Sequence, residues 1–273
     1  MLLLLALAAA GTVRAEDPTK PSTSRAARQQ ATQAIPYDKL DHAARQKVDA
    51  IVGNTSIYRR LPVQVIDCDP NMYLFLVRHP EVIVDIWQLM GVTDIALKRT
   101  SDVAFNATDG VGTSGVVEFL YGDHETHLIL TEGSYSGPLT ARPIRARCLL
   151  VLQTGYIKQP NGRYYVTNRL DAFMDVDNVG LELLARTFQN VFGKTADSNF
   201  SETAYFISKL SRTAETNAEG LSHMAAKLDD LDDATRAKFV EHAVDVEQRA
   251  SRRVAATGRG AMQVTRGQDA PPR

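Results

Sequence analysis

The densest group of side chains able to bind a metal ion or move protons is Asp123, His124, Glu125 and His127. Zinc enzymes that carry two histidines on one helix use i, i+4 spacing, and these two histidines are three residues apart. On a β-strand, residues 124 and 127 point to opposite faces, so they meet at one ion only if the chain bends between them. We therefore predict a polar cluster of Asp123, His124 and His127 at a hairpin end, and assign no metal site.

Two glycine-containing segments match known functional motifs only in part. Residues 110–115 have the glycine spacing of a dinucleotide-binding loop, but residues 116–121 after it have the composition of a strand, where that loop needs a helix. Residues 133–137 resemble a nucleophile elbow, but Tyr135 occupies the central position that the elbow reserves for serine. Both segments are predicted to be turns. The sequence thus assigns no catalytic residue and no cofactor.

The two cysteines, Cys68 and Cys148, are candidates for a disulfide. In an oxidising compartment a bond between them would close a loop of about 80 residues and stabilise the fold. The alternative is two free thiols, since Cys148 lies in the apolar run 146–152 and fits a buried position. Both alternatives stay open at this stage.

The two ends of the chain differ in composition from its middle. Residues 1–15 contain an apolar run, Leu2–Ala10, and then small residues at Val13 and Ala15, which is the pattern of a cleavable signal peptide. Residues 16–34 are rich in Thr, Ser, Gln and Ala and are predicted to be a flexible linker. Residues 251–273 are rich in Arg, Gly and Ala and are predicted to be a disordered tail. We therefore expect an exported protein, periplasmic or extracellular, with no membrane span in the mature chain.

Hydrophobic periodicity predicts an α+β fold, an antiparallel β-sheet packed against helices, with a C-terminal helical extension. Residues 35–215 are assigned to the α+β domain and residues 216–250 to the helical extension. Strand-like runs follow one another through 95–174 with short polar turns and no helix between them, which favours antiparallel pairing. Helical periodicity precedes these runs at 36–53 and 70–92 and returns after Asp177. A break between two helices is expected near Gly193.

This order of elements over residues 58–215 resembles the START-like (helix-grip) superfamily. Residues 82–87, Val-Ile-Val-Asp-Ile-Trp, stand where that superfamily has its short helices. The resemblance implies a curved sheet around a helix, with an apolar cavity between them. Trp87, Phe119 and Phe173 are the candidate residues for lining such a cavity. The helix break near Gly193 departs from the single long helix of that superfamily.

Three functions follow as hypotheses. The first is an exported protein that binds an apolar small molecule or lipid in the sheet–helix cavity. The second is an envelope structural or interaction protein that docks on a protein partner and has no enzymatic activity. The third is a hydrolase that uses the 123–127 region or His79. Nucleic acid is not an expected partner, because 31 Lys and Arg residues against 32 Asp and Glu residues produce no basic field.

Overall fold

A single antiparallel sheet of eight strands forms the centre of the protein. The computed structural model describes residues 17–137, 142–177 and 189–268. The strand order is β1-β8-β7-β6-β5-β4-β3, and β2 pairs with β8 alongside β1. The strands are β1 (Ile57–Arg60), β2 (Gln64–Asp67), β3 (Ala96–Arg99), β4 (Ala104–Thr108), β5 (Thr113–Gly122), β6 (Thr126–Tyr135), β7 (Ile144–Lys158) and β8 (Tyr164–Val176). The predicted antiparallel sheet is confirmed.

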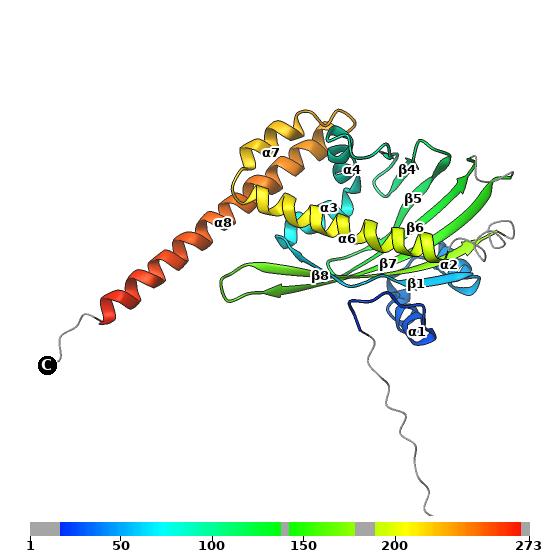
Figure 1. The fold of residues 1–273 in the computed structure, drawn as a ribbon, viewed down its shortest axis with the longest axis horizontal. Helices are drawn as coiled ribbons and strands as arrows, with labels where there is room; N and C mark the ends of the chain where they lie inside the picture. Colours follow the sequence, from blue (N-terminus) through cyan, green and yellow to red (C-terminus); the bar gives the residue numbers. More distant parts are fainter. Residues whose placement is uncertain (1–16, 138–141, 178–188, 269–273) are drawn as a thin grey trace, which may run out of the picture.

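Helices pack on both faces of this sheet (Figure 1). They are α1 (Arg25–Gln33), α2 (His42–Gly53), α3 (Pro70–Arg78), α4 (Pro80–Leu89), α6 (Gln189–Ala214), α7 (Ala218–Ala225) and α8 (Asp233–Gln268), with a short 3-10 helix at Tyr37–Lys39. Pro70 and Pro80 each stand in the first turn of a helix, where a missing N–H leaves no hydrogen bond unmade. The α+β class with C-terminal helices is therefore confirmed.

Two buried apolar clusters define the two faces. On one face, Ile66 and Val166 of the sheet pack with residues of α3, α6, α7 and α8. On the other face, Leu128, Leu149 and Phe173 pack with residues of α1 and α2. We call these the α6 face and the α2 face. Because the α7 and α8 side chains belong to the same cluster as those of α3, the C-terminal helices share the core of the sheet domain.

The hairpin turns follow from glycine geometry. Gly110 and Gly162 have φ angles of 70° and 78°, in the left-handed region that side chains disfavour. Gly110 lies in the turn between the paired strands β4 and β5, and Gly162 in the turn between β7 and β8. The short turns expected between the strand-like runs are thus found at these two positions.

Part of the expected flexible linker at 16–34 is a packed helix, so that prediction is wrong for residues 25–33. The Ser24 hydroxyl caps α1 by accepting a hydrogen bond from the Ala27 N–H at 3.0 Å. Ala27 and Ala31 are fully buried. The guanidinium of Arg60 donates to the Ala27 carbonyl at 3.0 Å. Alanine on a polar helix gives little hydrophobic signal, which is why composition alone suggested a linker.

The predicted disordered tail and the predicted helix break also differ from the structure. Helix α8 continues through residue 268, so residues 251–268 are helical, and Arg253 pairs with Glu215 at 3.0 Å. Helix α6 runs unbroken through Gly193, whose missing side chain leaves room for the Arg59 guanidinium. A Cβ at this position would lie 2.9 Å from that group. Gly193 therefore lets the Arg59 guanidinium lie close to the helix backbone, and the helix continues past it.

Candidate functional site

The middle of the α6 face carries apolar side chains that neither core cluster includes. The strand register places them on one face, and each is only partly buried. We call this set the apolar strip: Val117, Phe119, Ile129, Leu150, Leu170 and Met174. Apolar side chains that stay partly exposed side by side on one face indicate a binding surface more often than scattered single ones do. The strip is therefore the first candidate for a binding surface.

Two of the three predicted lining residues lie on this side of the sheet. Phe119 of β5 is a member of the strip, with its ring centroid 6.0 Å from that of Phe105. Trp87 of α4 packs edge-on against Phe206 of α6 at 5.4 Å and against the buried cluster of the α6 face. Trp87 thus joins α4 to α6, above the sheet.

Phe173 does not lie with them, so its predicted role in lining the cavity is wrong. It is fully buried on the α2 face, 5.2 Å from the ring of Tyr58. Residues 166 and 168 of β8 are buried on one face, and residues 171 and 173 on the other. Because successive strand residues point to opposite faces, the odd-numbered residues in this part of β8 point to the α2 face. The sequence alone does not show to which face Phe173 points.

The predicted polar cluster is a hairpin end between β5 and β6. The Asp123 carboxylate accepts hydrogen bonds from the Glu125 and Thr126 N–H groups, the Tyr121 hydroxyl and the Lys39 ammonium. These donors lower the pKa of Asp123 well below its ordinary value, against the opposing effect of burial. Asp123 therefore holds the turn and ties it to the segment before α2.

The two histidines of this cluster are in different environments. His124 is exposed in the turn, while His127 is fully buried on the α6 face. Burial lowers the pKa of His127 to about 4, with Arg78 contributing, so the imidazole is neutral near pH 7. Among the described residues, neither ring nitrogen of His127 has a hydrogen-bond partner. Gly122 lies opposite this ring, and a Cβ there would be 2.8 Å from the His127 Cδ2.

The two cysteines are free, which overturns the disulfide alternative. Cys68 follows Asp67, which pairs with Tyr165 of β8, whereas Cys148 pairs with Met174 of the same strand. Nine residues of strand separate these positions, or roughly 30 Å at 3.3 Å per residue. A disulfide requires Cα atoms within about 7 Å, so the fold keeps the two thiols apart.

We expect the protein to keep two titratable thiols after aerobic purification. Burial raises the pKa of both cysteines to about 12, so the thiolate form that reacts with disulfides is suppressed. Ellman's reagent should react slowly with the native protein and should report two thiols per chain in guanidinium without reductant. Zero thiols in guanidinium, restored to two by reduction, would show that the two cysteines are bonded.

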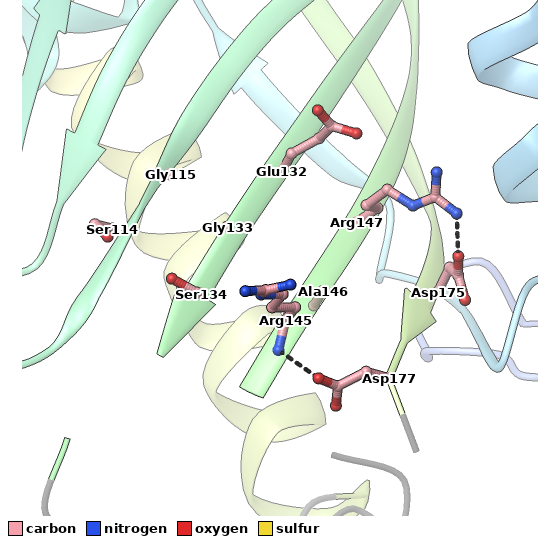
Figure 2. A pocket seen from close by; sticks show the side chains of 10 residues that line it. All are labelled: Ser114, Gly115, Glu132, Gly133, Ser134, Arg145, Ala146, Arg147, Asp175 and Asp177. Carbon is pink, nitrogen blue, oxygen red and sulfur yellow. Dashed lines mark hydrogen bonds and ion pairs between the residues drawn. The ribbon is translucent and has the colours of Figure 1, made fainter. Parts of the chain in front are cut away.

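A charged pocket lies at the far ends of β5 to β8, where Figure 2 shows its side chains. Its volume is about 580 Å³. Arg147 pairs with Asp175 at 2.5 Å, and the Asp177 carboxylate accepts from the Arg145 backbone N–H at 3.1 Å. Ser114 and Ser134 also line it, and no histidine is among the lining residues that the structure describes. The described lining thus combines hydroxyl groups with carboxylates and guanidinium groups.

A larger groove of about 1090 Å³ runs along the edge strand β1, between α1 and the start of α6. Ile57, Ala172 and Met174 contribute its apolar lining. Arg25, Arg28 and polar residues of α1 form one wall. This groove was not predicted from the sequence, because helix α1 forms one of its walls and the sequence of that helix indicated a flexible linker.

Comparison with known proteins assigns no family. No protein-family model matches the chain, and no curated protein matches its sequence. Within the described ranges, no helix is long and apolar enough to span a bilayer, and no three His, Cys, Asp or Glu side chains are grouped as metal ligands. The predicted signal peptide, residues 1–15, lies outside the described residues.

Proposed function

We propose that the protein is an exported binding protein for an apolar small molecule or lipid, which it holds against the α6 face of the sheet. The apolar strip is the observation that carries this proposal. Each face of the sheet has a buried apolar cluster, and the six side chains of the strip belong to neither. They stay partly exposed. Burying such area gains about 25 cal/mol per Å².

The architecture supports the same function. An antiparallel sheet with a long helix on one face is compatible with the helix-grip arrangement, in which a ligand lies between helix and sheet. Helix α6 is anchored at the sheet edge by Arg59, which pairs with Asp197, and by Gln64, which donates to the Ser201 hydroxyl. These contacts hold the helix along β1 and β2. We include membership in the START-like superfamily in the proposal.

The test is to identify what the protein carries. Residues 16–273 are purified without denaturant from the native host, extracted with organic solvent, and the extract is analysed by mass spectrometry. We expect about one apolar molecule per chain. We further expect Ile129→Ser, which places a hydroxyl in the strip, to lower this occupancy severalfold.

The matched control is Val65→Ser on β2, because Val65 is 64% exposed and lies outside the strip. It should leave the occupancy unchanged. A clean extract from the wild-type protein, together with no binding of an apolar dye such as Nile red, would refute the proposed function. Equal occupancy in both variants would place the ligand away from the strip.

A further inference from the structure

The groove along β1 contains an unfinished sheet edge. Leu61 donates its N–H to the Leu170 carbonyl of β8, so residues 59 and 57 also direct their backbone groups toward β8. Tyr58 and Arg60 direct theirs away from the sheet. Arg60 is paired, but no residue in the described part of the chain pairs with the backbone N–H or C=O of Tyr58. Tyr58 thus presents one donor and one acceptor to the groove.

The chain itself shows how this edge accepts a strand. Ser22 exchanges two backbone hydrogen bonds with Arg60, at 2.9 and 2.8 Å, in antiparallel orientation. The Val63 N–H donates to the Pro18 carbonyl at 2.9 Å. The register of this pairing would place Ser24 opposite Tyr58, but Ser24 donates its N–H to the Ser22 hydroxyl and its C=O accepts from the Arg28 N–H at the start of α1. Within the described residues, the backbone groups of Tyr58 are therefore left facing the groove.

The walls of the groove differ in chemistry. Arg25 forms no ion pair in the described structure, and the Arg28 guanidinium donates to the Val52 carbonyl, a neutral acceptor. No aspartate or glutamate is among the described residues that line the groove. The α6 side carries the apolar Ile57 and Met174 together with Arg59, whose charge is paired with Asp197. Paired residues of neighbouring strands share a face, so a strand in the groove would alternate between the arginine wall and the apolar wall.

We propose that this groove binds an extended peptide of another protein, with alternating acidic and apolar side chains, as an added antiparallel strand on β1. The backbone of the peptide exchanges hydrogen bonds with Tyr58, its carboxylates pair with Arg25 and Arg28, and its apolar side chains lie on Ile57 and Met174. Strand addition is a common way for proteins to bind extended segments at an exposed sheet edge. This surface is separate from the apolar strip except at Met174, so it does not rest on ligand binding.

The probe is the acetylated and amidated peptide Val-Glu-Val-Glu-Val with a fluorescein label, followed by anisotropy. We expect saturable binding that weakens at high salt, and about tenfold weaker binding of the same peptide with lysine in place of glutamate. The double variant Arg25→Gln and Arg28→Gln should lose about the same factor. Arg252→Gln, a matched change of an exposed arginine on α8, should bind as the wild type does.

Strand pairing has its own readout. On binding, hydrogen exchange of the Tyr58 amide should slow at least tenfold. N-methylation of alternate peptide residues separates the two edges of the added strand, because successive N–H groups face opposite sides. One of the two methylated peptides should therefore lose binding, and the other should keep it.

Three outcomes would overturn the proposal. Equal affinity for the glutamate and lysine peptides would remove the role of the arginines. Binding of decanoate with no binding of the peptide would assign the groove to a small amphiphile. A dimer in sedimentation, with the Tyr58 amide already protected and no peptide binding, would assign it to a second copy of the chain.

Discussion

The substitution Asp171→Leu is expected to destabilise the protein by about 3–5 kcal/mol, the usual cost of leaving a buried charge without its partner. Asp171 is fully buried, and its carboxylate accepts from the Tyr58 hydroxyl at 2.5 Å and from Arg60 Nε at 2.8 Å. Arg60 is itself only 9% exposed. Without the carboxylate, the Arg60 guanidinium would stay buried and uncompensated. Guanidinium unfolding followed by circular dichroism measures the loss.

The double variant Arg60→Met with Asp171→Leu is the control for this prediction. Replacing both members of a buried ion pair by apolar residues is often neutral, so it should recover most of the loss. Asp175→Asn, at a more exposed ion pair, should cost less than about 1 kcal/mol. A loss below about 1 kcal/mol for Asp171→Leu would mean that water or a rearranged side chain solvates Arg60, contrary to the structure.

The substitution Asp85→Asn is expected to stabilise the protein at pH 7.5, by about 2 kcal/mol. Asp85 is 5% exposed, and its Oδ2 atom has no hydrogen-bond partner in the part of the chain that the structure describes. Burial raises its pKa to about 6, with repulsion from Asp230 and Glu81 adding to the effect and Lys98 opposing it. Each pKa unit corresponds to about 1.4 kcal/mol, so ionising this carboxyl in the folded state costs stability.

The pH dependence follows from the direction of that pKa change. The folded protein binds the Asp85 proton more tightly than the unfolded chain, whose aspartates titrate near pH 3.9. This contribution to stability is present below about pH 4 and is lost as the pH rises through about 6. The stability difference between wild type and Asp85→Asn should therefore be smallest near pH 4, grow between pH 4 and 6, and stay constant above about pH 6. Asp94→Asn, an exposed aspartate, controls for the loss of one charge. A constant difference from pH 4 to 8 would contradict the mechanism.

The sequence could predict the sheet because its signals are local. Alternating apolar residues in β6, the Asp109-Gly110 turn and the turn around Gly162 determine strands and hairpins within a few neighbours. The two short strands β1 and β2 both pair with β8, as one interrupted edge strand would.

The candidate sites could be predicted only in part, because face and partner are properties of the assembled sheet. Phe119 and Phe173 have the same composition signal, but the register of β5 and β8 places them on opposite faces. The burial of His127 depends on the same register. The groove along β1 depends on α1, whose packing through Ala27 leaves almost no hydrophobic pattern to detect.

The pairing of β8 with the two N-terminal strands also constrains how the molecule folds. This strand pairs with β1, β2 and β7, and its pairing with β1 joins Tyr58 to Phe173 across more than a hundred residues of intervening chain. Contacts between residues so distant in sequence slow folding, because a long loop must close, at a cost in chain entropy, before these contacts can stabilise the folded state. Helices α1 and α2 cannot complete their core until β8 arrives. We therefore expect the N-terminal third of the chain to lack its core during synthesis, and the sheet edge at β1 to form among the last parts of the fold.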